Sequence, residues 1–495
     1  MNCAALSIRG SFSEKSIFIV GGSGFIGKVW LSMMLDFIPN FEKIYILVRS
    51  SRGKSAKARF AEIYATSPVF THLHNKYGPN ALNVNKLVVL EGDVTLSKFG
   101  LSNADYNNLV SQVDVTLNFA ADLRFYAPLD EMLKANAEGP LNVAKFILAS
   151  KKSKLLHIST VYVAGAADGV VEESLSKQIS PNGTSFSAEE EFNWAKQEGL
   201  AARSRDATNT ELTNIGISRA QRLGWPTTYT YTKALGEILL SEKISRERLS
   251  IFRPSIVESA EKYPFPGWNE DFNGTAPYVQ LLSSRYRVIV GKPQNKLDVI
   301  PVDYVVKGLF IATSALLHGV HADIYQSSTS SVNPLTVEKA SSFIVKFYRS
   351  AERKRLGGFL FPYPKTRFVS PKHIFSGPSL RKIENGVSSL FEKISREKNS
   401  AKFLDQSGLK AAIRFIKHKA KLIESISKVY RPFIYDYNYT FKSDNLLAHK
   451  VVEEEFFYSP SKIQWDYYWQ NIHIPGLRRW CLPQMKKMTG EKKNV

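Results

Sequence analysis

Cysteine is nearly absent from this 495-residue chain, which has only Cys3 and Cys481. Two distant cysteines argue against a disulfide framework and a cysteine-ligated metal site, and they fit the reducing environment of the cytosol. The sequence also lacks H-E-x-x-H and C-x-x-C patterns, which bind metals in many enzymes. We therefore expect a cytoplasmic protein that needs no metal.

Long apolar runs are missing as well. The nearest candidate for a membrane span, residues 305–320, contains Lys307 and is shorter than the roughly 20 residues that a spanning helix needs. The N-terminus has no continuous apolar segment typical of a secretory signal. Hydrophobic residues make up 44% and charged residues 22%, which excludes global disorder, collagen and coiled coil. A chain of this length is expected to hold two or three domains.

Acidic residues are too few to balance the basic ones. The 66 Lys and Arg against 45 Asp and Glu give a net charge of +21. Residues 346–431 carry 21 basic and 6 acidic residues, so +15 of this charge lies there. Such an excess indicates an anionic partner: nucleic acid, a membrane surface or a phosphorylated substrate. No recognisable RNA- or DNA-binding signature is present, so no nucleic acid is expected.

Short apolar runs alternate with helical spacing in the first 160 residues. Strands are predicted at residues 16–20, 43–48, 86–90, 113–119 and 154–159, with further candidates at 249–252 and 297–300. Helices are predicted at residues 28–37 and 132–148. This alternation predicts the α/β class, with a doubly wound parallel Rossmann-type sheet.

Two changes in composition interrupt this pattern. The polar, charged stretch at about 181–223 is interpreted as an insertion before the next helix. From about residue 350, basic helix-forming sequence replaces the alternation, and an aromatic tail follows it. We predict a Rossmann-type domain over residues 1–368 and a basic, mainly helical C-terminal domain over residues 369–495.

A glycine-rich turn follows the first predicted strand, and it reads Gly21-Gly22-Ser23-Gly24-Phe25-Ile26-Gly27. Residues without a Cβ allow the backbone to turn tightly and to approach a pyrophosphate at the positive N-terminus of the next helix. A glycine turn without any ligand is the alternative. Its position between a strand and a helix favours the dinucleotide-binding interpretation for all seven residues.

Basic residues follow the second predicted strand, where a carboxylate would favour NAD. Arg49 lies 22 residues past Gly27, followed by Arg52 and Lys54. This cationic group suits the 2′-phosphate of NADPH, although a solvated basic turn is an alternative. Asp93, after the third strand, is a candidate for the adenine amino group, and the small Ala120 would let the cofactor lie close.

A hydroxyl pair and a tyrosine–lysine pair form the candidate catalytic group. Ser159 and Thr160 end the fifth strand, and Tyr229 and Lys233 lie four residues apart, on one face of a helix. A neighbouring ammonium is expected to lower the pKa of the Tyr229 phenol. Such a phenol can donate a proton to a carbonyl as hydride arrives. Tyr231 has no lysine four positions later, so Tyr229 is preferred.

Together, the motifs GGSGFIGK, ILVR, GDVT, ISTVYV and GWPTTYTYTKALGE resemble the extended short-chain dehydrogenase/reductase superfamily. The segments FRPSIVES (252–259), PFPGWNEDFNG (264–274) and DVIPVDYVV (298–306) resemble alcohol-forming fatty acyl-CoA reductases within it. The resemblance covers about residues 15–315 and extends to YNYTFKSDN (437–445) and the tail at 465–480. Gly22 departs from the family pattern, which more often has a larger residue there.

The resemblance implies NADPH as the hydride donor, a long-chain acyl-CoA or other acyl thioester as substrate, and a primary alcohol as product. It maps the catalytic trio to Thr160 (or Ser159), Tyr229 and Lys233, with Tyr229 and Lys233 also contacting the cofactor. A sugar-nucleotide epimerase or dehydrogenase and a non-catalytic NADP sensor are the alternatives.

Basic residues recur at helical spacing in the C-terminal segment, which predicts an amphipathic helix with a cationic stripe at Lys410, Arg414, Lys417, Lys421 and Lys428. The stripe is a solvated helix face, or it steers coenzyme A or an acidic acyl carrier protein, or it contacts an anionic membrane peripherally.

Overall fold

The structure of the protein is a computed structural model. It describes residues 5–51, 53–78, 86–175, 177–270, 274–283, 287–355, 365–373, 423–424 and 426–483. The chain is divided into two compact units, and each unit is built from several segments. Unit 1 comprises residues 1–270, 298–333 and 440–464, and unit 2 comprises residues 271–297, 334–439 and 465–495. The predicted division at residue 368 stays a prediction, because much of the C-terminal segment lies outside the described residues.

Unit 1 contains a seven-stranded parallel sheet in the order β11-β7-β5-β4-β1-β2-β3. Its strands are β1 (Ser16–Val20), β2 (Lys43–Val48), β3 (Leu87–Glu91), β4 (Val115–Asn118), β5 (Lys154–Ile158), β7 (Leu249–Pro254) and β11 (Ile324–Ser327). The order reverses between β1 and β4, which is where a doubly wound sheet binds its ligand. The predicted α/β class and Rossmann-type sheet are therefore confirmed.

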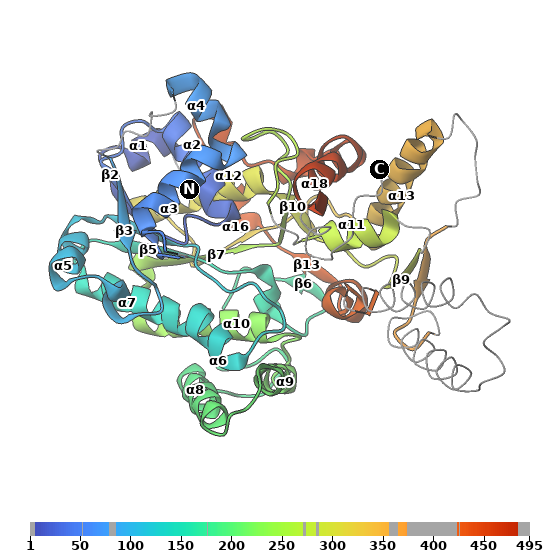
Figure 1. The fold of residues 1–495 in the computed structure, drawn as a ribbon, viewed down its shortest axis with the longest axis horizontal. Coiled ribbons are helices and arrows are strands. Elements are labelled where there is room, and N and C mark those ends of the chain that lie inside the picture. The colour runs from blue at the N-terminus through green and yellow to red at the C-terminus, as the bar shows by residue number, and fades with distance from the viewer. Residues whose placement is uncertain are drawn as a thin grey trace, which may run out of the picture. The chain divides into compact units, whose positions relative to one another are not determined.

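Helices cover both faces of this sheet (Figure 1). One face packs on α2 (Phe25–Phe37) and α12 (Val302–His318), where Trp30 stacks on Phe310 with ring centroids 5.1 Å apart. The other face packs on α5 (Asn103–Gln112), α7 (Gly139–Ala149) and α10 (Thr228–Lys243). Successive β1 residues alternate between the faces, so Phe18 and Val20 join the second core, which includes Phe146.

The remaining elements of unit 1 are short helices and small sheets. Strand β8 (Ile256–Glu258) pairs in parallel with β10 (Val299–Pro301), and β6 (Gly169–Val171) pairs with β13 (Tyr439–Phe441). The further helices are α1 (Ile8–Phe12), α3 (Ala56–Thr66), α4 (Thr71–Tyr77), α6 (Leu129–Leu133) and α16 (Asp444–Leu447). A π-helical turn, Lys134–Glu138, joins α6 to α7, so the helix predicted at 132–148 is interrupted by one wider turn.

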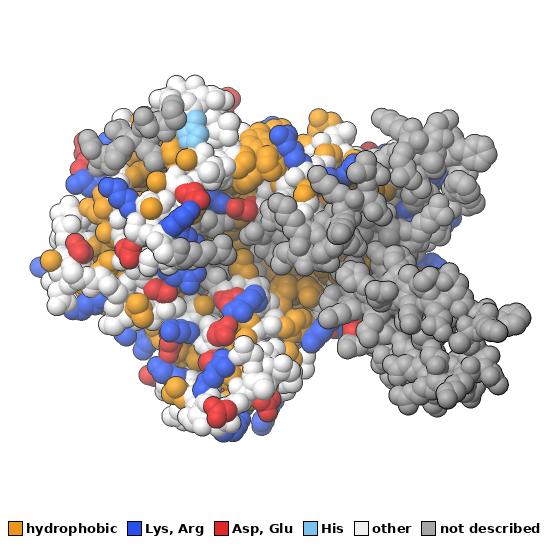
Figure 2. Space-filling model, viewed as in Figure 1, with side chains coloured by type: hydrophobic (Ala, Val, Ile, Leu, Met, Phe, Trp, Pro, Cys, Tyr) orange, Lys and Arg blue, Asp and Glu red, His pale blue; other side chains and the backbone are white. Residues whose placement is uncertain are grey.

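The predicted insertion contains two helices, α8 (Ala188–Ser204) and α9 (Asn209–Arg222). Both contact α6 and α10 at the lower edge of unit 1 in Figure 1. Each begins with a hydroxyl N-cap, Ser187 or Thr208, and Thr208 forms a capping box with Glu211. Basic and acidic side chains are interspersed over this region in Figure 2, as expected for a solvated surface joined by ion pairs.

Unit 2 contains α11 (Ala276–Ser283), α13 (Val337–Arg355), α17 (Trp465–Tyr467), α18 (Ile474–Trp480) and the parallel pair β9 (Val288–Val290) and β12 (Arg367–Val369). The Tyr278 hydroxyl lies 2.6 Å from Ser341 Oγ and joins α11 to α13. Tyr468 and Trp469 of the aromatic tail are buried, whereas Tyr467 is exposed.

No helix in the described part of the chain is long and apolar enough to cross a membrane.

Candidate active site

The glycine turn lies at the carboxyl end of β1, where the sheet order reverses. Gly21 has a φ of +83°, and a Cβ on it would lie 2.6 Å from Ala120 N. A Cβ on Gly27 would lie 2.8 Å from Gly22 Cα, so α2 packs directly against the turn. A Cβ on Gly22 would lie 2.8 Å from Ile19 Cγ2, so the larger residue typical of the family requires a neighbour to move. Gly21 and Gly27 are needed for backbone packing, whereas Gly22 is limited only by side chains, chiefly that of Ile19.

Gly24 differs from the other glycines of the turn. It is exposed, its φ is −81°, and a Cβ there would meet only Gly21 O at 3.5 Å. Gly24 is also the N-cap of α2, with no side chain accepting hydrogen bonds from the first amides of the helix. Open space in front of uncapped amides fits the pyrophosphate of a dinucleotide, with Ser23, Phe25 and Ile26 partly exposed beside it.

The structure brings Arg49 and Asp93 together at the carboxyl ends of β2 and β3. Arg49 Nη1 lies 3.8 Å from Asp93 Oδ2, and the Arg49 side chain is 70% exposed, which leaves its guanidinium accessible to a further anion. Asp93 Oδ1 accepts a hydrogen bond from Thr95 N at 2.8 Å, which closes the turn after β3. Of the other basic residues, Lys54 pairs with Glu62, and Arg52 lies outside the described residues.

Tyr229 and Thr160 meet at the carboxyl end of β5. Both side chains are buried, and they form a hydrogen bond with one another. Thr160 also accepts a hydrogen bond from Tyr162 N at 3.3 Å, which fixes its hydroxyl. Ser159 is buried beside it, but its Oγ has no hydrogen-bond partner among the described residues. Of the two hydroxyls predicted from the sequence, the structure brings Thr160 to the tyrosine.

The expectation that Lys233 lowers the pKa of Tyr229 is wrong for this structure. Burial raises the pKa of the Tyr229 phenol well above its usual value, the hydrogen bond from Thr160 opposes this effect, and the charge of Glu237 adds to it. Lys233 is turned toward the sheet instead, where its Nζ donates a hydrogen bond to Ile158 O at 2.7 Å. Tyr229 is therefore held in its protonated form, the form that a proton donor needs.

Lys233 is almost completely buried. Burial lowers the pKa of its ammonium to about 8, and the nearby Glu237 carboxylate opposes that shift. A titratable cation this close to neutrality, beside a buried phenol, is typical of a functional site.

Tyr231, which has no lysine four positions later, does not join Tyr229 and Thr160. Its hydroxyl donates a hydrogen bond to Glu191 of α8, and Glu191 also pairs with Arg219 of α9. Tyr231 thus anchors the inserted helices to α10. Of the two tyrosines, the structure brings Tyr229 to Thr160 and Tyr231 to Glu191.

Sequence reasoning missed several polar residues around the site. Asn136, in the π-helical turn, donates from Nδ2 to Thr232 Oγ1 and to Asp122 O, both at 3.1 Å. His157 of β5 is fully buried beside Asn118, with Nδ1 3.2 Å from Asn118 Nδ2. Burial, and then the charge of Lys233, lower the pKa of His157 well below its usual value, so it is neutral. For His157 and Asn118, the available signal was a polar residue within an apolar run.

A buried ion pair completes the surroundings of Lys233. Glu237, one helical turn after Lys233, accepts hydrogen bonds from Arg253 Nε at 3.0 Å and from Arg253 Nη2 at 2.6 Å. Arg253 Nη1 also donates to Ser174 O at 3.0 Å. The site thus contains a protonated phenol, a hydroxyl and a buried cation beside a glycine turn. That set can donate a proton to a carbonyl oxygen and stabilise its negative charge.

Comparisons with known proteins indicate the family of this chain. The profile of the family described as male sterility protein matches residues 19–309. Among named relatives, "Probable fatty acyl-CoA reductase 4" of Arabidopsis thaliana is 28% identical, over 95% of this chain and 98% of its own. "Alcohol-forming fatty acyl-CoA reductase" of Simmondsia chinensis is 26% identical, with the same shares of the two chains covered.

Solved structures share the fold at low identity. The terminal R domain of the myxalamid PKS-NRPS pathway is 14% identical with a TM-score of 0.57, covering 96% of this chain and 91% of that one. The reductase domain of a nonribosomal peptide synthetase from Mycobacterium tuberculosis is also 14% identical, with a TM-score of 0.53 and coverage of 96% and 93%.

Proposed function

The chain belongs to the male sterility protein family, and from this premise we propose that it is an NADPH-dependent fatty acyl-CoA reductase that forms primary alcohols. A nicotinamide cofactor and oxidoreductase chemistry follow from the family and the fold. One observation carries the proposal: the Thr160 and Tyr229 hydroxyls meet next to buried Lys233 at the carboxyl end of the parallel sheet. The relatives named as fatty acyl-CoA reductases support the substrate class.

Bound NADPH would supply hydride to the acyl carbonyl, and the residues of this chain would manage charge and protons. Thr160 and Tyr229 would donate hydrogen bonds to the carbonyl oxygen as it becomes negative. Their burial excludes water, which strengthens these hydrogen bonds. The carbon–sulfur bond of the thioester would then break as the carbonyl re-forms, which gives an aldehyde and a thiolate that takes a proton from solvent.

The same residues would act a second time on the aldehyde. Hydride adds to its carbonyl carbon, and the Tyr229 phenol donates its proton to the oxygen, giving the alcohol. Two hydride equivalents and two protons are consumed for each thioester. The buried Lys233 ammonium would hold the nicotinamide ribose.

Two other functions fit parts of the sequence. A sugar-nucleotide epimerase or dehydrogenase shares the sheet and the glycine turn, and an NADP sensor needs no catalytic group. The test is incubation of the purified protein with palmitoyl-CoA and NADPH, followed by gas chromatography. Hexadecanol supports the proposal. Absence of both hexadecanal and hexadecanol, together with turnover of a nucleotide sugar, would identify the epimerase instead.

The thioester carrier and the membrane are further parts of the proposal. We propose coenzyme A as the main carrier, with an acyl carrier protein and an anionic membrane surface as weaker partners of the basic segment at 346–431. In the cationic stripe, Lys410, Arg414, Lys417 and Lys421 lie outside the described residues, and Lys428 lies in a helical stretch at 426–431. Co-sedimentation with anionic and neutral vesicles at low and high salt tests the membrane contact, because screening weakens it.

A further inference from the structure

The segment between β4 and α6 packs against the reactive tyrosine. The rings of Phe125 and Tyr229 meet edge to face, with centroids 5.6 Å apart. Ala127 and Met132 complete the buried apolar cluster around Tyr229. The direction of the phenol therefore depends on where residues 120–128 lie.

Regular secondary structure does not fix this segment, since residues 119–128 belong to no helix or strand. Burial fixes it only in part, because the Leu123 side chain is 59% exposed. Polar contacts hold its beginning: Asp122 N donates to Asn136 Oδ1 at 2.9 Å, and Arg124 N donates to Asp122 Oδ1 at 3.0 Å.

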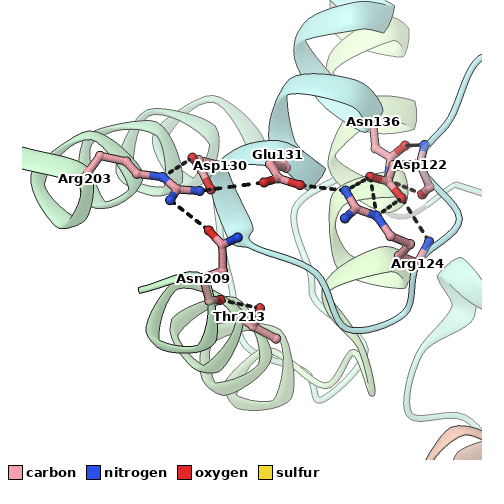
Figure 3. A network of polar contacts seen from close by, with 8 residues as sticks. All are labelled: Asp122, Arg124, Asp130, Glu131, Asn136, Arg203, Asn209 and Thr213. Carbon is pink, nitrogen blue, oxygen red and sulfur yellow. Dashed lines mark hydrogen bonds and ion pairs between the residues drawn. The ribbon is translucent and has the colours of Figure 1, made fainter. Parts of the chain in front are cut away.

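The Arg124 side chain ties this beginning to α6 (Figure 3). Its Nε lies 3.0 Å from each carboxylate oxygen of Asp122, and its Nη2 donates to Glu131 Oε2 at 2.7 Å. Burial alone would raise the pKa of Asp122, but the hydrogen bonds from Arg124 outweigh it and keep the pKa below its usual value. Both partners are thus charged, and the flat guanidinium holds two carboxylates in fixed directions.

The inserted helices continue this network. Arg203 of α8 donates to Asp130 at 2.8 Å and lies 3.8 Å from Glu131, the carboxylate that Arg124 also uses. Arg203 Nη1 further donates to Asn209 of α9 at 2.9 Å, as Figure 3 shows. The insertion therefore supports the side of α6 that receives Arg124.

We propose that Arg124 is a positioning residue for the reduction: by joining Asp122 to Glu131 it holds Phe125 against Tyr229 and keeps the phenol aimed at the substrate carbonyl. The role of Tyr229 rests on the proposed function. The Arg124 side chain is 57% exposed, although that of Asp122 is only 17% exposed. Ion pairs with an exposed partner add little to stability, so the effect is expected in turnover more than in folding. A displacement of about 1 Å at a reacting group costs on the order of a hundredfold in rate.

The experiment compares Arg124→Gln with Arg205→Gln. Arg205 is a matched control, because its side chain is 56% exposed against 57% for Arg124, and it pairs with Glu198 at 3.5 Å at the end of α8. Arg124→Gln is expected to lower kcat by about ten- to a hundredfold, with the NADPH KM and Tm unchanged. Arg124→Lys keeps the positive charge but lacks the planar guanidinium, so it should recover part of the loss in kcat. Adding Glu131→Gln to Arg124→Gln should lower kcat little further, because both substitutions break the same contact, the one between Arg124 and Glu131.

Hydrogen exchange gives a readout that needs no substrate. Amides of residues 122–128 and of the first turn of α10 should exchange faster in Arg124→Gln than in Arg205→Gln. Equal kcat and equal exchange in the two variants would overturn the positioning role. Inactivity of the wild type on every acyl thioester would reject the proposed function, whereas the exchange difference would still decide whether Arg124 orders the segment.

Discussion

Glu237 and Arg253 form a buried ion pair one turn of α10 beyond Lys233, with Arg253 Nη2 2.6 Å from Glu237 Oε2. Their side chains are only 0% and 5% exposed. The charged and titratable groups that act on Lys233, or on which it acts, are Glu237 from its own helix and His157 from β5, with Arg253 beyond Glu237. Glu237 favours the charged form of Lys233, and Arg253 balances Glu237.

Glu237→Gln is expected to move the alkaline limit of activity to lower pH. Lys233 has a pKa of about 8, so its ammonium is present below that pH and is lost above it. Removal of the Glu237 charge removes the effect that raises this pKa, so the ammonium is lost at lower pH. The measurement is kcat/KM between about pH 6 and 10, where the Tyr229 phenol stays protonated.

The same variant leaves Arg253 without its carboxylate, and breaking a buried pair typically costs about 3–5 kcal/mol of stability. Rates therefore need to be measured well below the Tm of the variant. Glu198→Gln, at a partly exposed carboxylate of α8, is the control. An alkaline limit that stays where the wild type has it would show that Lys233 does not set it.

Tyr229→Phe should remove proton donation and leave the fold intact. General acid catalysis contributes about 10²–10⁴-fold, and kcat on both acyl-CoA and free aldehyde should fall by that factor. The NADPH dissociation constant should change little. Tyr231→Phe is the matched control on the same helix: it loses a hydrogen bond to Glu191, so its Tm should fall while its kcat stays close to that of the wild type. Near-normal turnover of Tyr229→Phe would remove this phenol from the mechanism.

Gly24→Ala should separate cofactor binding from folding. The φ of −81° suits alanine, and the added Cβ meets only one backbone oxygen at 3.5 Å, so Tm should not fall. The methyl group would nevertheless occupy the space in front of the α2 amides and weaken NADPH binding by about tenfold, or 1.4 kcal/mol. Gly21→Ala contrasts with it, because its φ of +83° and the 2.6 Å approach to Ala120 predict a loss of stability. Unchanged NADPH affinity in Gly24→Ala would place the pyrophosphate elsewhere.

The main sheet was predictable because its strands are short apolar runs with turns at both ends. Residues 16–20 and 43–48 form β1 and β2 with the predicted bounds. Strand β11, with the sequence IYQS, has too few apolar residues for its pattern to show. The predicted range 297–300 overlaps β10 (Val299–Pro301), but that strand pairs with β8 rather than joining the main sheet. Pairing across such distances depends on tertiary packing.

The chemistry of the site was less predictable than its residues. Spacing placed Tyr229 and Lys233 on one face of a helix, and the structure has them there. Spacing could not show that Tyr229 would be buried, which raises its pKa, and it could not show that Lys233 would bond the Ile158 carbonyl instead. Asn136 was hidden inside a helix whose π-helical turn has no sequence signal. Contacts between distant segments decide these properties.

Arg49→Ala tests the choice between NADPH and NADH. A charge-assisted contact to the 2′-phosphate is worth about 1.5–3 kcal/mol, so the NADPH KM should rise about tenfold or more. NADH has no 2′-phosphate, so its KM should barely change and it serves as the internal control. The Arg49 side chain is 70% exposed and Asp93 lies 3.8 Å away, so high salt should weaken NADPH binding by the wild type more than by the variant. Equal losses with both cofactors would mean that Arg49 acts on the turn after β2, where Arg59 Nη1 donates to its carbonyl, and not on the phosphate.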